Sequence, residues 1–161
     1  MTKDIYQLTI FIIFTISLTY AESTNVELEK ACTLNNSKAC FDLGEKYIYE
    51  DSKNKMISII YFKKACSLGY TKSCFSVGTL YDKGRKTKEE AVKYYTIACE
   101  KGIGRACNNL GNKYKNGSGV DKNTMKALNL FKTACDSEDG VEKGCQNKIN
   151  LEEEIKLLEN K

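Results

Sequence analysis

Eight cysteines recur in pairs along the chain, and their period is the feature that most restricts its fold. They stand at positions 32, 40, 66, 74, 99, 107, 135 and 145. The members of a pair are 8, 8, 8 and 10 residues apart, and successive pairs begin 34, 33 and 36 residues apart. A fixed period in the mid-thirties is the signature of stacked helix-turn-helix repeats. The spacing therefore predicts an all-α solenoid.

The residues around each cysteine pair repeat too, which predicts two helices per repeat. One pattern ends in Ala-Cys and carries small or apolar side chains at i, i+4 and i+7, over residues 58–66, 91–99 and 127–135. The other begins at the second cysteine and carries Leu or Val, then Gly, then Tyr, over residues 40–47, 74–81 and 107–114. We expect its glycines to let the neighbouring helix approach closely.

Two finer features belong to this helical pattern. Thr87 and Glu90 have the spacing of a capping box, which helps to place the start of a helix. Five tyrosines lie at helical spacing, where aromatic side chains pack between helices more often than they form a ligand site. These are Tyr47, Tyr81, Tyr94, Tyr95 and Tyr114.

Each cysteine pair spans the turn from the second helix of one repeat into the first helix of the next. Residues eight apart across a tight turn between antiparallel helices can approach to disulfide distance. Of roughly 105 possible pairings, the repeat selects Cys32–Cys40, Cys66–Cys74, Cys99–Cys107 and Cys135–Cys145. The alternative is zinc, but zinc knuckles place cysteines two to four residues apart and no CxxC occurs here. We therefore expect structural disulfides and neither metal nor cofactor.

The N-terminus predicts export. Residues 1–21 resemble a secretory signal peptide, with Lys3, an apolar run from Leu8 to Leu18, and small residues before a cut ahead of Glu22. The alternative is a retained membrane anchor, but the apolar run is shorter than the roughly 20 residues that a membrane-spanning helix needs. Cleavage predicts a secreted or periplasmic protein without a membrane segment, and an even cysteine count in an exported chain favours disulfides.

Composition excludes several kinds of chemistry. The chain has no histidine, so it builds no Ser-His or Cys-His pair and no imidazole metal site by itself. Its net charge of +4 is too mild to argue for nucleic acid as a partner.

The full pattern resembles that of Sel1-like repeats, in the cysteine-rich Helicobacter-type branch of secreted proteins. Residues 110–135 (LGNKYKNGSGVDKNTMKALNLFKTAC), with the GSGV loop at 117–120, fit best, and the resemblance covers roughly residues 25–147. It implies a right-handed α/α superhelix with one disulfide per repeat junction, expected to be a monomer. The predicted layout is a signal peptide (1–21), a half-repeat cap (22–37), three repeats (38–71, 72–104, 105–142) and a capping helix (143–161).

The same resemblance implies two alternative functions. Some family members bind penicillin or hydrolyse β-lactams slowly, and others are regarded as host-interacting or peptidoglycan-related proteins. The serine chemistry needs SxxK with SDN and KTG motifs. The chain has an SxxK at Ser52, in a variable loop, but neither of the other motifs, so no catalytic residue is identified. Cytoplasmic and mitochondrial relatives promote assembly, a third possibility that the signal peptide disfavours.

In such superhelices the first helix of each repeat lines the concave face, where a peptide, protein or cell-wall fragment would bind. Asparagine and arginine side chains suit amide and carboxylate groups of such ligands. The candidate residues in the second and third repeats are Ser76, Thr79, Asp82, Arg105, Asn108, Asn109, Asn112 and Lys115. The first repeat offers Asp42 and Glu45, for which a solvated helix face is the favoured alternative.

Overall fold

A computed structural model describes residues 25–50, 54–84, 87–138 and 142–160, and these residues form helices and turns without any strand. The expected signal peptide lies outside the described residues, as does Ser52. Residues 25–33 are helical and lead into α2. The remaining helices are α2 (Ser37–Glu50), α3 (Lys55–Ser67), α4 (Thr71–Asp82), α5 (Lys88–Glu100), α6 (Gly104–Asn116), α7 (Thr124–Asp136) and α8 (Glu142–Glu159).

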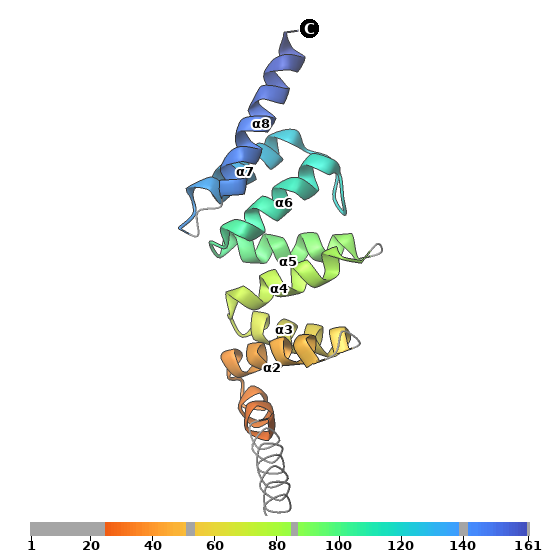
Figure 1. Ribbon diagram of the computed structural model, residues 1–161, viewed down its shortest axis with the longest axis vertical. Coiled ribbons are helices and arrows are strands. Elements are labelled where there is room, and N and C mark those ends of the chain that lie inside the picture. The colour runs from red at the N-terminus through yellow and green to blue at the C-terminus, as the bar shows by residue number, and fades with distance from the viewer. Residues whose placement is uncertain (1–24, 51–53, 85–86, 139–141, 161) are drawn as a thin grey trace, which may run out of the picture.

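The helices stack one upon another along the long axis of the molecule (Figure 1). α2 packs against α3, α4 against α5, and α6 against α7, and each pair also contacts the next. Two helices per repeat at the predicted places confirm the all-α solenoid. Its main core runs across the middle of the stack, where Phe62, Val77, Tyr95 and Leu110 belong to one buried cluster.

A glycine set against an aromatic ring joins the two helices of every repeat. A Cβ on Gly44 would lie 2.5 Å from Cδ1 of Phe62, and one on Gly78 would lie 2.6 Å from Cδ1 of Tyr95. In the third repeat the same position, Gly111, lies against the ring of Phe131. The expected close approach is confirmed, because a side chain in place of the glycine would overlap the ring.

Four disulfides bridge the turns that lead from the second helix of one repeat to the first helix of the next, and no cysteine is free. All four predicted pairings are confirmed, including Cys135–Cys145 with its longer loop. Their Cα–Cα distances are 4.7, 4.9, 4.7 and 4.6 Å in chain order. Three of the turns place the second residue after the helix in the left-handed region, at Asn35, Gly69 and Gly102, which reverses the chain so that the cysteines can meet.

The tyrosines pack between helices, as expected. The ring of Tyr47 stacks on Tyr61 with centroids 5.5 Å apart, and Tyr81 lies against Tyr94 at 6.0 Å. In the third repeat Tyr114 lies beneath the ammonium group of Lys126, 4.3 Å from its ring centre.

The prediction of a capping box at Thr87 is wrong about the hydrogen bond, although it places the start of the helix correctly. α5 starts at Lys88, directly after Thr87, but the Thr87 side chain makes no capping bond. Its hydroxyl instead donates to the carbonyl of Tyr81 at 2.5 Å, across the loop from α4. The tertiary contact to α4 therefore replaces the local one. A true side-chain cap occurs at α7, where Asn123 accepts from the backbone N–H of Lys126.

Candidate functional site

The candidate residues lie on α2, α4 and α6, the first helix of each pair. Residues 72, 75, 76 and 79 of α4, and Lys83 directly after it, line neighbouring cavities along one side of the helix. Their spacing of three and four residues puts them on one face. This face carries an apolar groove and a separate polar pocket.

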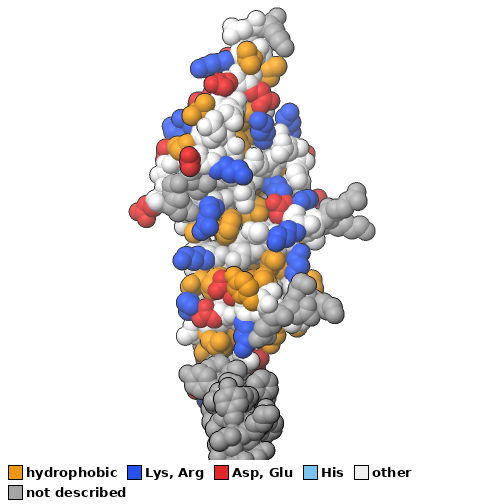
Figure 2. Space-filling view, in the orientation of Figure 1, with side chains coloured by type: hydrophobic (Ala, Val, Ile, Leu, Met, Phe, Trp, Pro, Cys, Tyr) orange, Lys and Arg blue, Asp and Glu red, His pale blue; other side chains and the backbone are white. Residues whose placement is uncertain are grey.

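The apolar groove starts as a cavity of about 260 Å³ between α2 and α4. Phe62 of α3 is buried and contributes to its floor, while Tyr49 at its edge is 83% exposed. Its other lining residues are Glu45, Ile48, Phe75, Ser76, Thr79, Leu80 and Lys83. Figure 2 shows hydrophobic side chains gathered in the lower part of the solenoid, with charged side chains of both signs around them.

A second cavity of about 610 Å³ shares Glu45, Phe75 and Ser76 with the first, so the two form one groove. The Arg105 guanidinium lies over the ring of Phe75, 5.5 Å from its centre. Charges of both signs line this part, from Glu45, Lys72, Arg105 and Glu138. We call the two cavities together the apolar groove.

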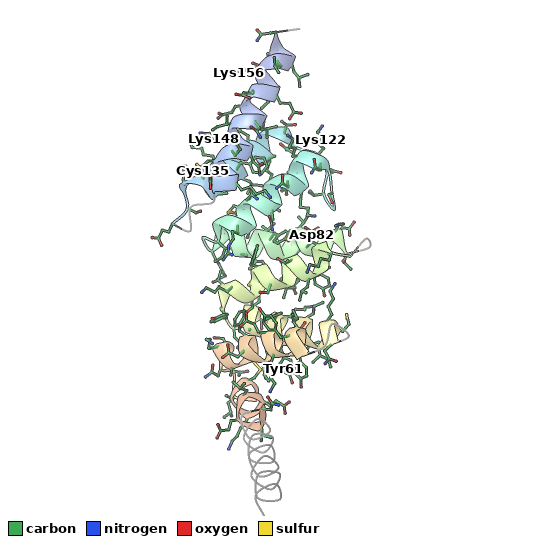
Figure 3. The ribbon with its side chains drawn as sticks, in the orientation of Figure 1. Tyr61, Asp82, Lys122, Cys135, Lys148 and Lys156 are labelled. Carbon is green, nitrogen blue, oxygen red and sulfur yellow. A yellow bond between two sulfur atoms is a disulfide. The ribbon has the colours of Figure 1, made fainter. Side chains whose placement is uncertain are left out.

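The polar pocket lies farther along α4 and α6 and has a volume of about 190 Å³. It is lined by Asp82, Asn109, Asn112, Lys113, Asn116 and Ser118. Asp82 lies at the C-terminal end of α4 (Figure 3), one helical turn beyond Thr79 of the apolar groove. The two sites are therefore neighbours along α4.

The GSGV loop shapes the polar pocket. Gly117 ends α6 in the left-handed region, and its N–H donates to the carbonyl of Lys113. Gly119 has a φ of +76°, and a Cβ there would overlap the backbone of Lys88 at the start of α5. Because this loop packs so closely on the second repeat, it carries Ser118 into the pocket wall.

A charged network forms one wall of the polar pocket. The ammonium groups of Lys113 and Lys88 both donate to Oδ1 of Asp82, the second at 2.9 Å. Oδ2 accepts from the hydroxyl of Tyr95 at 3.5 Å. Partial burial by itself would raise the pKa of Asp82, but the hydrogen bonds from Lys113 and Lys88 outweigh it and hold the pKa below its ordinary value. Burial raises the pKa of Tyr95, although hydrogen bonds with Thr79 and Asn109 oppose the shift.

The structure divides the candidate residues among these sites. Ser76, Thr79 and Arg105 line the apolar groove together with Glu45. Asp82, Asn109 and Asn112 meet in the polar pocket.

Three other candidates lie elsewhere. Asn108 is buried, and its Oδ1 accepts from Asn147 of α8 at 2.8 Å, so it joins two helices. Lys115 pairs with Glu154 at 2.8 Å. Asp42 pairs with Lys38 on its own helix.

Sequence reasoning missed the apolar half of the site and the buried lysine. Phe75, Ile48 and Leu80 lie outside the repeated Leu/Val, Gly and Tyr positions, and their place in the groove lining depends on how α2 and α4 are spaced. Lys113 follows Asn112 in a polar run, where a charged side chain usually faces solvent. The one available signal was the GSGV loop, which marks the third repeat as different.

Within the described ranges, no group of three or more Cys, Asp or Glu side chains is arranged to hold a metal ion. None of the helices described is long and apolar enough to cross a membrane.

Comparisons with known proteins agree with this architecture. The family model of the Sel1 repeat matches residues 37–70, 71–103 and 104–139. Comparison with curated proteins gives no match. Among solved structures, cysteine rich protein B of Helicobacter pylori is 33% identical, with a TM-score of 0.57, over 81% of this chain and 93% of that one.

Two further structures share the fold. A Sel1 repeat protein from Oxalobacter formigenes is 23% identical, with a TM-score of 0.66, over 78% of this chain and 96% of that one. A protective antigen of uropathogenic Escherichia coli with an SLR fold is 27% identical, with a TM-score of 0.65, over 74% of this chain and 26% of the antigen. The chain thus spans about a quarter of that antigen. These similarities confirm the right-handed α/α superhelix, and the chain belongs to the Sel1 repeat family.

Proposed function

We propose that this chain is an exported Sel1 repeat protein that binds a peptide segment, from a protein or from peptidoglycan, along its concave face. The observation that carries the proposal is the apolar groove, in which two cavities share Glu45, Phe75 and Ser76. Binding sites are typically concave and mostly apolar, with a few polar groups that fix the ligand's orientation.

The lining of the groove suits a peptide better than a uniformly charged polymer. Ile48, Phe75 and Leu80 offer apolar contact to a side chain. Glu45 and Glu138 face the same groove as Lys72 and Arg105, so charges of both signs are available to polar side chains of the ligand. Arg105 is already stacked on Phe75, which reduces the entropy that ordering it would cost.

The disulfides support a location of the protein outside the cytoplasm. Disulfides persist in the periplasm, on the cell surface and in secreted proteins, and all eight cysteines are paired here. The predicted signal peptide at residues 1–21 agrees with this compartment.

The test is selection of binders from a random octapeptide library displayed on phage, with affinity then measured by fluorescence anisotropy on the oxidised protein. Phe75→Ala should weaken a selected peptide about tenfold or more, because it removes the aromatic wall shared by both cavities. Met125→Ala is the matched control, since it removes an exposed apolar side chain of α7 that does not line the groove. Equal loss in both variants, or no selectable peptide, would contradict the proposal.

The second candidate is β-lactam hydrolysis, and it has one observation in its favour: Ser118 and Lys113 line the same polar pocket. The Lys113 ammonium donates to Asp82, and a protonated lysine has no lone pair with which to take a proton from serine. Peptide binding is therefore the better supported of the two. If the protein hydrolyses nitrocefin and Ser118→Ala abolishes that activity, β-lactam hydrolysis becomes the better supported function.

A further inference from the structure

We infer that copies of this chain associate head to tail, with the C-terminal end of α8 in one copy docking on the outer face of α3 in the next. Such an association does not depend on peptide binding, and it differs from the monomer that the family resemblance implies. Two exposed apolar surfaces of opposite charge carry it, one near each end of the stack (Figure 1).

The first surface, the α3 face, lies on the side of α3 opposite the buried Phe62. Its members follow one another at i, i+1, i+4, i+7 and i+8, and they are Met56, Ile57, Ile60, Lys63 and Lys64. All three apolar members are exposed, Met56 at 66% and Ile60 at 64%. Because α3 contains three lysines and no acidic residue, this face is apolar at one end and basic at the other.

The other repeats show that the solenoid does not need apolar side chains at these outward positions. One repeat of 33 residues further on, the three apolar positions of the α3 face become Glu89, Glu90 and Lys93 of α5. In α7 two of the three are polar, Lys126 and Asn129. Neighbouring apolar side chains that remain exposed although packing does not require them are typical of an interaction surface.

The second surface lies where α8 extends past the helix on which it packs. Near its start, Gly144 lies against Ala134 of α7, and Leu151 packs with Ala127 near the beginning of α7. Leu158 is about 10 Å farther along α8, at 1.5 Å per residue. The last turns of α8 therefore project beyond α7, as Figure 1 shows.

This projecting part is apolar and acidic. Leu157 and Leu158 are each 67% exposed. Residues 152–159 contain four glutamates and one lysine. Glu154 is paired with Lys115 of α6, whereas Glu153 and Glu159 are exposed. We call Glu153, Leu157, Leu158 and Glu159 together the α8 end.

The two surfaces complement each other in both polarity and charge. Apolar contact between Ile60 and the leucines of the α8 end would supply affinity. Lys63 and Lys64 favour an acidic partner, whereas contact between two α3 faces or between two α8 ends would bring like charges together. Charge complementarity thus selects a second copy, joined through unlike surfaces.

One copy cannot bring its own two surfaces together, because α4 to α7 lie between them in the stack (Figure 1). Since every copy carries both surfaces, the contact is heterologous, and such contacts extend into open chains of protomers. The apolar groove stays open in the assembly, because its floor residue Phe62 is on the other side of α3 from the α3 face.

The experiment is sedimentation-velocity ultracentrifugation of the oxidised protein over a concentration series. A contact of a few side chains per partner is smaller than most specific interfaces, so we expect a Kd on the order of 10–100 µM. Wild type should form dimers and longer chains as its concentration rises, and association should weaken severalfold as the salt concentration rises from about 0.05 to 0.5 M.

Variants of either surface should weaken association at least about tenfold, because each removes apolar contact and places like charges together. Ile60→Glu disables the α3 face, and Leu157→Lys/Leu158→Lys disables the α8 end. All three positions are exposed, so the fold should tolerate the changes. Met125→Glu is the matched control, since it changes an exposed apolar side chain of α7 outside both surfaces and should associate like wild type.

Mixing the two variants tests the head-to-tail geometry directly. The Ile60→Glu protein keeps its α8 end, and the double leucine variant keeps its α3 face. An equimolar mixture should therefore recover association but stop at one-to-one dimers, since any further contact needs a disabled surface. A mixture that stays monomeric would overturn the inference.

Wild type that remains monomeric at about 1 mM would overturn it too, because so weak a contact falls outside the affinity expected for a specific interface. If that monomer sediments with phosphatidylglycerol vesicles and Ile60→Glu abolishes the binding, the α3 face belongs to a membrane surface and not to a second copy.

Discussion

Lys113 on α6 donates a hydrogen bond to Asp82 on α4, although 31 residues separate them in the chain. The lysine side chain is only 9% exposed and the aspartate side chain 28%. The pair joins the second repeat to the third and forms a wall of the polar pocket. It therefore links the stability of the stack to the candidate site.

Asp82→Asn should destabilise the protein by about 1–3 kcal/mol, because it leaves a buried ammonium without its anion. Urea denaturation followed by far-UV circular dichroism measures the loss. The double variant Asp82→Asn/Lys113→Met should recover part of it, since no charge then remains buried. An Asp82→Asn protein as stable as wild type would show that the pair contributes nothing.

The contribution of Asp82 to the free energy of unfolding should depend on pH. Its pKa is lowered in the folded state, because the hydrogen bonds from Lys113 and Lys88 outweigh the opposite effect of burial. This contribution is complete above the pKa of aspartate in the unfolded chain, about 3.9. It is lost as the pH falls through the lower pKa that Asp82 has in the folded state. The Tm difference between wild type and Asp82→Asn should thus be constant near neutrality and shrink below about pH 4. A difference that persists unchanged at pH 2 would refute this assignment.

Gly78→Ala should cost about 1–3 kcal/mol, the usual penalty for overpacking a core. The new Cβ would lie 2.6 Å from Cδ1 of Tyr95, and this ring is itself buried among neighbouring side chains. Thermal and urea melts of Gly78→Ala, Tyr95→Leu and the double variant form a cycle. The two changes should be less than additive, because the smaller leucine side chain relieves the overlap; simple additivity would mean that the tyrosine ring does not restrict this position.

Removing one disulfide, with Cys66→Ser/Cys74→Ser, should lower the free energy of unfolding by about 2.6 kcal/mol, the chain-entropy value for a nine-residue loop. Reduction of all four bridges should lower the Tm severely, since their summed effect is comparable to the stability of a whole domain. Differential scanning calorimetry with and without reductant tests this. An unchanged melt in reductant would contradict a structural role for the bridges.

The fold could be predicted largely because its determinants are local. Cys66 and Cys74 are eight residues apart, so their pairing needs only one turn between helices. Gly78 and Tyr95 lie in two consecutive helices whose apolar stripes are visible in the sequence. In a solenoid each repeat contacts its neighbours, so the period carries most of the topology.

The candidate site was less predictable because it depends on contacts between repeats. Asn108 and Asn109 are adjacent in sequence and equally polar, yet the first joins α6 to α8 and the second lines the pocket. Thr87 has the sequence of a capping residue but donates to Tyr81 instead. In each case the outcome is decided by a residue from another helix, which no local pattern contains.

By itself, the sequence determined the two-helix repeat, the four disulfides and the glycine contacts, because each depends on spacing within one repeat or one turn. Only the tertiary structure decided which candidate residues share a cavity, that Phe75 and Arg105 stack in a groove, and that Lys113 is buried against Asp82. The physical reason is that a groove and a buried ion pair depend on how neighbouring repeats are spaced and rotated. Small changes in that packing expose or bury a side chain without altering the pattern of the sequence.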